Sequence, residues 1–141
     1  MHSYTIQELK IGQQERLVKT ISEDDTRLFA QISGDHNPVH EDEEYAKKSV
    51  FGARIVHGLL VAGYISTVIG MQLPGPGAIY MGQTLKFLKP VYIGDTITAI
   101  VTLKELDEGR NRITLETNVF NQDNQLVLSG EALVKPAIRN N

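Results

Sequence analysis

The chain has 141 residues, a formal net charge of −3 and no cysteine. This length is typical of a single domain, predicted to span residues 1–141. The Lys and Arg residues are scattered, which argues against nucleic acid as a partner, and the lack of cysteine excludes disulfides, thiolate chemistry and a cysteine-ligated zinc site. The first ten residues lack the basic-then-apolar pattern of a signal peptide, so a cytoplasmic location is expected.

The N-terminal third predicts a weak strand over residues 15–21, followed by a helix. Ser22 begins this helix, because its hydroxyl can cap free amides and Asp25 completes a capping-box-like pair. Gly34 ends the helix. The predicted buried stripe consists of Leu28, Phe29 and Ile32.

A second helix is predicted to begin at Asn37 and Pro38 and to continue to Lys48. Asparagine suits the N-cap, and proline suits the first helical position because no amide hydrogen bond is lost there. Two i,i+4 ion pairs, Glu43–Lys47 and Glu44–Lys48, are expected on a solvated face.

The most apolar stretch predicts a central helix over residues 56–71. A membrane span is not expected, because glycine and polar residues interrupt the stretch and it falls short of the ~20 strongly apolar residues that a bilayer needs. A helix that is apolar on nearly every side is instead a core helix. Ala62, Ser66 and Gly70 form a small-residue stripe that would let neighbouring backbone approach. The Gly75–Gly77 loop that follows is not a phosphate cradle, because no Lys-Ser/Thr follows it.

From Ala78 onward, apolar and polar residues alternate with a period of two, which is typical of strands with one buried face. The alternating segments are residues 85–87, 97–103, 113–119 and 126–134. Turn-like segments separate them at residues 91–94, 107–111 and 121–124. Short links between consecutive strands predict an antiparallel sheet, and the central helix is its only large apolar partner. The fold class is therefore α+β, with the sheet wrapped around the helix.

The candidate site lies in the motif Gly34-Asp35-His36-Asn37-Pro38-Val39-His40. Asp35 and His40 are titratable side chains five residues apart across an Asn-Pro turn. Taken alone, Asp35 could cap the turn at Asn37, and His40 could be a surface residue at a helix start. A metal site of Asp35 with His36 and His40 is not expected, because the helix that begins at Pro38 should make the two rings diverge.

Three motifs in this order resemble the MaoC-like, (R)-specific enoyl-CoA hydratases, which have the hot dog fold. The motifs are residues 33–40, residues 55–60 (Ile-Val-His-Gly-Leu-Leu), and residues 87–91 (Phe-Leu-Lys-Pro-Val) with Gly94-Asp95. The resemblance covers residues 22–135. It implies an antiparallel sheet around a long central helix and a homodimer with no membrane association.

By motif position, the resemblance implies that Asp35 and His40 form the catalytic dyad and that the Gly58 amide receives the thioester oxygen. Ser66 falls where short family members carry a serine near the active site; the alternative is a core serine bonded to the carbonyl four residues back. Gly58 could instead be a packing glycine. His57 is expected to be structural, with its ring bonded to backbone near the loop.

The implied activity is hydration of a trans-2-enoyl-CoA to the (R)-3-hydroxyacyl-CoA, in fatty acid or polyhydroxyalkanoate metabolism. A carboxylate and an imidazole that share one water can handle its protons, and a helix N-terminus supplies amides for the developing oxyanion, so no metal or redox cofactor is expected. The alternatives are a (3R)-hydroxyacyl-acyl-carrier-protein dehydratase, a non-catalytic acyl-CoA-binding module and a thioesterase. Candidate residues for the CoA phosphates are Lys86, Lys89, Arg54 and Arg110.

Overall fold

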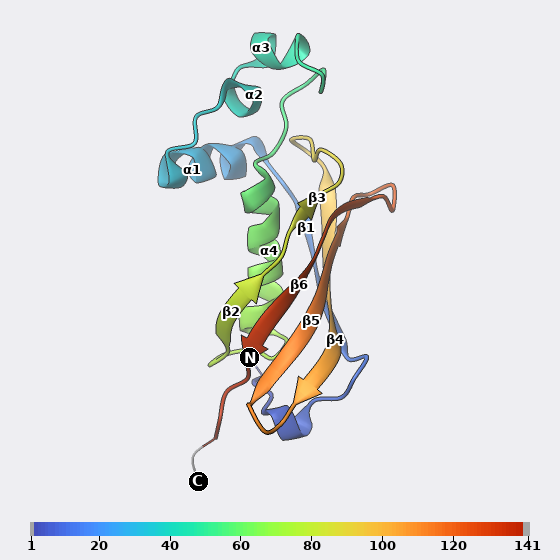
Figure 1. The fold of residues 1–141 in the computed structure, drawn as a ribbon. Helices are drawn as coiled ribbons and strands as arrows, with labels where there is room; N and C mark the ends of the chain where they lie inside the picture. The colour runs from blue at the N-terminus through green and yellow to red at the C-terminus, as the bar shows by residue number, and fades with distance from the viewer. Residues whose placement is uncertain (1, 140–141) are drawn as a thin grey trace.

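The structure, a computed structural model, describes residues 2–139, which contain one antiparallel sheet of six strands (Figure 1). The strands are β1 (Gln14–Thr20), β2 (Ile79–Gln83), β3 (Lys86–Phe87), β4 (Thr96–Asp107), β5 (Arg112–Phe120) and β6 (Leu126–Lys135). The helical segments are η1 (Ile6–Glu8), α1 (Glu23–Ser33), α2 (Pro38–Glu41), α3 (Glu43–Lys47) and α4 (Gly58–Met71). The sheet order is β1-β4-β5-β6-β2, and β3 pairs with β6.

The central helix α4 runs along one face of the sheet and contacts β1, β4 and β5 (Figure 1). Its buried residues are Val61, Ile65, Val68 and Ile69. Every second residue in most of β4 and β5 is buried, because successive side chains of a strand point to opposite faces. The predicted α+β hot dog arrangement is confirmed, and the central helix begins two residues later than expected.

The hydrophobic core and the segment that precedes α4 are nearly separate. The core cluster contains Ile21 and Val56 but, among the described residues, none from the segment between them. Residues 22–55, which we call the overhang, carry α1, α2 and α3 beyond the end of the sheet, near the N-terminal end of α4 (Figure 1). The rest of the described chain, the body, holds the core.

The capping of α1 is confirmed, but its predicted buried stripe is wrong. The Ser22 hydroxyl accepts from the Asp25 amide at 3.1 Å, and Gly34 ends the helix with a left-handed φ of 79°. Leu28 and Ile32 are 55% and 85% exposed and Phe29 is partly buried, whereas the fully buried residues are Thr26 and Ala30. The reason is that α1 lies beyond the sheet rather than over its face.

The predicted helix from Asn37 to Lys48 is two short helices. Asn37 and Pro38 begin α2 as expected. Asp42 then has an extended backbone, with φ −107° and ψ 109°, and its side chain accepts from the Tyr45 amide to cap α3. A short acidic side chain favours such a cap over a helix interior, which explains the break.

The charged face of α3 is solvated, as predicted, but its ion pairing differs. Glu43, Glu44, Lys47 and Lys48 are all exposed. The pair that forms is Glu44–Lys47, i,i+3, at 3.5 Å, in place of the expected i,i+4 pairs. Exposed pairs of this kind contribute little to stability, so this difference has small energetic consequence.

The small-residue stripe of α4 does not bring neighbouring backbone close within this chain. Ser66 and Gly70 are exposed, and a Cβ atom built on Gly70 would meet nothing within 4 Å among the described residues. None of the helices in residues 2–139 combines the length and the apolar character that spanning a membrane requires.

Candidate active site

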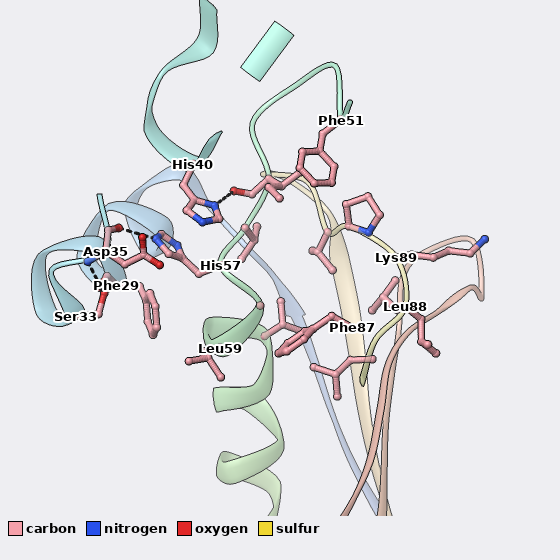
Figure 2. A pocket seen from close by; sticks show the side chains of 18 residues that line it. Phe29, Ser33, Asp35, His40, Phe51, His57, Leu59, Phe87, Leu88 and Lys89 are labelled. Atoms are coloured by element: carbon pink, nitrogen blue, oxygen red, sulfur yellow. Dashed lines mark hydrogen bonds between the residues drawn. The ribbon is translucent and has the colours of Figure 1, made fainter. Parts of the chain in front are cut away.

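A pocket of about 620 Å³ lies where the overhang meets the start of α4 (Figure 2). Its polar end contains Asp35, His40 and His57. Apolar side chains from four other parts of the chain form the rest of the wall: Phe29 and Phe51 from the overhang, Val61 from α4, Phe87 and Leu88 at β3, and Val127 and Leu128 from β6. The pocket thus joins a polar corner to an apolar channel.

Asp35 is the first residue after the left-handed turn at Gly34, and its side chain is exposed at the pocket. One carboxylate oxygen, Oδ1, accepts from the Asn37 amide at 3.2 Å, so Asp35 does cap this turn. The Asp35 amide in turn donates to the Ser33 hydroxyl at 3.1 Å. Within residues 2–139, Oδ2 has no hydrogen-bond partner and stays available to a ligand.

His40 is buried, with 8% of its surface exposed, so the surface alternative is wrong. Its Nδ1 lies 2.8 Å from the Ile55 carbonyl oxygen, which can only accept, so Nδ1 carries the proton and Nε2 a lone pair. Burial lowers the pKa of His40 below 6.5 and outweighs the raising effects of the Ile55 bond, Asp35 and Glu41. The ring is therefore neutral at neutral pH, and its Nε2 can accept a proton.

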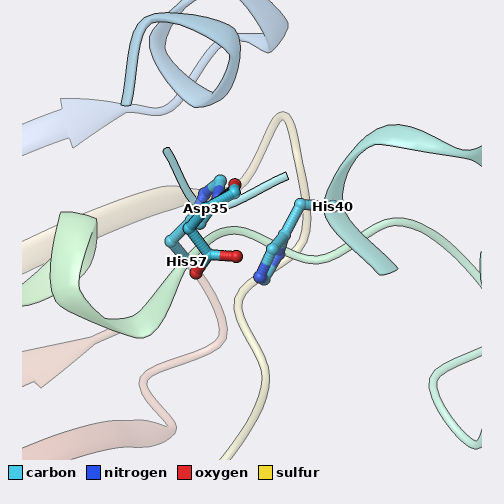
Figure 3. Close-up of side chains that lie close together, drawn as sticks. All are labelled: Asp35, His40 and His57. Atoms are coloured by element: carbon cyan, nitrogen blue, oxygen red, sulfur yellow. Dashed lines mark hydrogen bonds between the residues drawn. The ribbon is translucent and has the colours of Figure 1, made fainter. Parts of the chain in front are cut away.

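His57 comes directly before α4, and its ring is bonded to backbone near the loop, as predicted. Its Nε2 donates to the Asp35 carbonyl oxygen at 3.0 Å. The His57 ring also stacks on His40, with 3.8 Å between ring centroids and 25° between planes (Figure 3). No spacing in the sequence indicated this contact, because the two histidines are 17 positions apart and only the fold brings them together.

The carboxylate and the two stacked rings are close enough for a metal ion to be considered. One ligand atom from each of Asp35, His40 and His57 lies within 4.8 Å of the other two. A histidine binds a metal along a lone pair in its ring plane, and two nearly parallel stacked rings do not direct these lone pairs at one point. His36 is not part of this group; it is exposed, and its Nδ1 lies 2.8 Å from a Glu41 oxygen.

Gly58 is the first residue of α4 and lines the pocket. No side chain caps the helix, and in the described part of the chain the Gly58 amide has no hydrogen-bond partner. A Cβ atom at this position would lie 2.6 Å from Cε1 of Phe87. Gly58 is thus a packing glycine, and it also has a free amide at a helix N-terminus. Such an amide is suited to binding a negatively charged oxygen.

The family profile described as "MaoC like domain" matches residues 7–125. The chain belongs to the MaoC-like family. It is 50% identical over 128 residues to the (R)-specific enoyl-CoA hydratase of Rhodospirillum rubrum, covering 91% of this chain and 88% of the relative. It is 48% identical over 129 residues to the 3-hydroxybutyryl-CoA dehydratase of Methylorubrum extorquens, covering 92% and 82%. The solved (R)-hydratase from A. caviae involved in PHA biosynthesis matches with a TM-score of 0.90 and 43% identity, over 92% of this chain and 98% of that one.

Ser66 does not reach the pocket of this MaoC-like chain. It follows Gly58 by eight residues, about 12 Å along a helix axis, and it is exposed and absent from the lining residues. It is not the predicted back-bonded core serine either, because it is exposed and, among the described residues, its hydroxyl makes no hydrogen bond to the Ala62 carbonyl. The helical spacing alone places Ser66 on a different part of the molecule from the polar corner.

Of the four basic residues considered for the CoA phosphates, one lines the pocket. That residue is Lys89, in the loop after β3 (Figure 2). Arg54 is bonded to Glu23 at 2.9 Å, and Arg110 lies 3.8 Å from an Asp107 oxygen. Lys89 is therefore the cation best placed for an anionic group at the pocket.

Proposed function

We propose that the protein is an (R)-specific enoyl-CoA hydratase, which reversibly adds water to a trans-2-enoyl-CoA in fatty acid or polyhydroxyalkanoate metabolism. One observation carries this proposal: a carboxylate and a neutral imidazole meet at the polar end of an apolar pocket, beside a free amide at the start of α4. The names of the relatives support the same chemistry, since a hydratase and a 3-hydroxyacyl-CoA dehydratase catalyse one reaction in opposite directions.

In this mechanism Asp35 and His40 bind one water molecule. Oδ2 of Asp35 and Nε2 of His40 are both hydrogen-bond acceptors, so one water can donate to each. As the water oxygen attacks C3 of the thioester, the pair takes a proton from it and returns a proton to C2. The product gains one water: hydroxyl on C3 and hydrogen on C2.

Gly58 is proposed to stabilise the charge that develops on the thioester oxygen. Negative charge appears there between the attack on C3 and the protonation of C2. The Gly58 amide has no competing partner in the described chain, and the dipole of α4 favours negative charge at this end. The acyl chain then extends into the apolar channel between α4 and β6, which Val61, Val127 and Leu128 line.

The proposed reaction requires no metal ion or redox cofactor, because the pair handles the protons and the amide the oxyanion. Prolonged treatment with EDTA should therefore leave the rate unchanged. A loss of activity that zinc restores would contradict this part of the proposal and favour a metal-bound water held by Asp35, His40 and His57.

The thioester carrier is proposed to be CoA, with Lys89 contacting its phosphates. Lys89 is exposed and lines the pocket, where it can meet a phosphate of the substrate. Replacing Lys89 with Ala should raise KM for the CoA substrate and leave kcat nearly unchanged. A much higher kcat/KM on the acyl-carrier-protein thioester would instead identify the (3R)-hydroxyacyl-acyl-carrier-protein dehydratase.

The protein is proposed to act as a homodimer. β2 is an edge strand with Ile79, Tyr80 and Met81 exposed, and Met71 is exposed at the end of α4. An exposed apolar edge favours pairing with another chain. Light scattering at micromolar concentration should give a mass of two chains, and a mass near 15.7 kDa would contradict the dimer.

The proposal treats residues 1–141 as one domain that works in the cytoplasm. A single core cluster joins residues from η1 through β6, which supports one folding unit. Fractionation of cells that express the tagged protein would test the location.

The deciding experiment is an absorbance assay for loss of the conjugated enoyl thioester. Turnover of trans-2-butenoyl-CoA, with the product oxidised only by an (R)-specific 3-hydroxyacyl-CoA dehydrogenase, would support the proposal. Saturable binding of the substrate without turnover would overturn it in favour of a non-catalytic acyl-CoA-binding module. Release of free CoA would identify a thioesterase.

A further inference from the structure

His57 contacts both halves of the proposed dyad. Its Nε2–H donates to the main-chain carbonyl of Asp35 (Figure 2), and its ring face lies on the ring of His40. Phe29 contacts the His57 ring as well, with centroids 4.8 Å apart and planes tilted by 54°. His57 is 2% exposed, so the ring is enclosed on all sides.

We propose that His57 is a positioning residue, which fixes the main chain that carries Asp35 and orients the His40 ring for a shared water. This inference rests on the proposed function for the reaction, and it adds a third residue with a separate task. His57 is the N-cap of α4 and belongs to the body, whereas Asp35 and His40 belong to the overhang. The residue therefore connects the reacting groups to the part of the fold that holds the hydrophobic core.

We assign the positioning role to His57 because few other hydrogen bonds restrain Asp35. Its side chain is exposed and, among the described residues, accepts a hydrogen bond only from the Asn37 amide, two residues away in the same loop. The bond from His57 links this loop to a residue 22 positions later. Without that bond, the described chain offers no hydrogen bond from the body to the main chain of Asp35.

The unpaired nitrogen of His57 argues against a purely packing role. Nε2 donates to a carbonyl, whereas Nδ1 is buried without a hydrogen-bond partner in residues 2–139. A buried polar atom without a partner is destabilising, because it has lost its hydrogen bond to water. A leucine or phenylalanine would fill the same space without this cost, so the donor at Nε2 is what the site uses.

The stacked rings also couple the protonation of His40 to His57. The charged groups around His40 are Asp35 from the loop, Glu41 from α2, and Glu23, Arg27 and Arg54, which line a small cavity with it. Asp35 and Glu41 raise the pKa of His40, whereas His57 lowers it, after burial, which is the largest effect. Two imidazoles in face contact disfavour a second proton, so His57 helps to keep His40 neutral.

Two variants separate the donor from the ring. His57→Gln keeps an N–H group near the position of Nε2 and loses the ring; His57→Phe keeps the ring and loses the donor. We expect kcat to fall by about 10-fold in each, because the reacting groups lose their alignment, while KM changes by less than about 2-fold. His36→Gln is the matched control, since His36 is exposed and outside this contact, and it should behave like wild type.

The second readout is the titration of His40, followed by NMR of the ring protons in wild type and both variants. We expect the pKa of His40 and the acid limb of log kcat to move to higher pH in both variants, because the neighbouring imidazole that opposes protonation is gone. If His57→Phe does not fold, His57→Gln provides both measurements.

Unchanged kcat and an unchanged His40 titration, with only a lower melting temperature, would overturn the proposal and make His57 a packing residue. A loss confined to KM would overturn it too. If wild type does not turn over enoyl-CoA at all, the proposed function fails, and the NMR titration still tests the coupling of His57 to His40 by itself.

Discussion

The overhang and the body contribute differently to stability and to the proposed chemistry. The body contains every residue of the core cluster, including long apolar side chains that are fully enclosed, such as Leu115 and Ile65. The overhang contributes none of them, and yet it carries Asp35 and His40. Because apolar burial is the main source of stability, the body holds the fold, and the overhang is held by the body.

Catalytic activity and stability should therefore respond to different substitutions. Asp35 lies in a loop with an exposed side chain, so replacing it removes little packing. Leu115 lies on β5, away from the pocket lining, so replacing it removes packing and no reacting group. The two regions meet at His57 and Gly58, where substitutions should affect both properties.

The largest effect is expected from the dyad in the overhang. Asp35→Ala and His40→Ala should each lower kcat by ~100-fold or more, the range typical of losing a positioned acid–base group. If both groups act on one water, the double variant should be no slower than the single ones, because the second loss removes a step that is already disabled. A kinetic double-mutant cycle measures this.

The outcome that contradicts a shared water is additivity. Independent roles predict that two losses of ~3 kcal/mol become ~6 kcal/mol in the double variant, about 100-fold slower again. Asp35→Asn provides the stability control, since it keeps the shape of the side chain. It should keep the melting temperature of wild type while activity is lost.

The second-largest effect is expected in the body, where a substitution should lower stability and leave activity nearly unchanged. Leu115→Ala should lower the free energy of unfolding by about 2–5 kcal/mol, through lost burial and a residual cavity, while kcat of the folded protein stays near wild type. Leu28→Ala, the same substitution on an exposed face of the overhang, should cost no more than about 0.5 kcal/mol. Similar costs for the two variants, measured by urea denaturation, would show that the core does not divide as described.

The same comparison explains how far the sequence could predict the fold. The body was predictable because its patterns extend over whole elements: alternation indicated β4, β5 and β6, and the most apolar stretch of the chain indicated α4. The overhang was predictable mainly at its helix ends, Ser22, Gly34 and Asn37, where local backbone preferences and hydrogen bonds decide the structure. Which face of α1 is buried depends on the tertiary contacts of the helix, which its own sequence does not specify.

The candidate site was predictable in its residues but not in its geometry. The motif from Gly34 to His40 and the His57–Gly58 helix start named the groups that do meet at the pocket. The stacking of His57 on His40 and the burial of His40 depend on how the overhang folds back onto α4. Ser66 is the opposite case, because the resemblance implied a place near the site and Ser66 is not among the residues that line the pocket of this chain.

A third, smaller effect is expected at the junction of the two regions. Gly58→Ala places a Cβ atom against the ring of Phe87, which must turn within the pocket. We expect kcat/KM to fall by about 10-fold, because the acyl group and the amide are misaligned, while stability changes by less than about 1 kcal/mol. Gly63→Ala, also on α4 but with open space around its Cβ, should leave kcat/KM unchanged.

A combined variant tests the cause of this loss. If the ring of Phe87 transmits it, the penalty of Gly58→Ala should shrink in a Phe87→Leu background, which removes the contact. An undiminished penalty would mean that the added methyl group acts directly on the amide or its ligand.

The smallest effect concerns the dependence of stability on pH, and it arises in the overhang. Burial lowers the pKa of His40 in the folded chain below its ordinary value of 6.5. As the pH falls below 6.5, the unfolded chain binds a proton at this residue before the folded chain does, so the free energy of unfolding decreases until the folded pKa is passed. This contribution is fully present above pH 6.5 and is lost at lower pH.

The carboxylates change the free energy of unfolding in a separate, more acidic pH range. The Ser22 amide lowers the pKa of Asp25 below 3.8, so its contribution to stability is lost only as the pH falls through that lower range. Urea denaturation of wild type and His40→Asn at several pH values between about 7.5 and 5 therefore isolates the histidine. The stability difference between the two proteins should shrink as the pH falls. A constant difference would mean that His40 binds its proton equally well in both states, and then the neutral Nε2 that the shared-water mechanism requires would lose its support from burial.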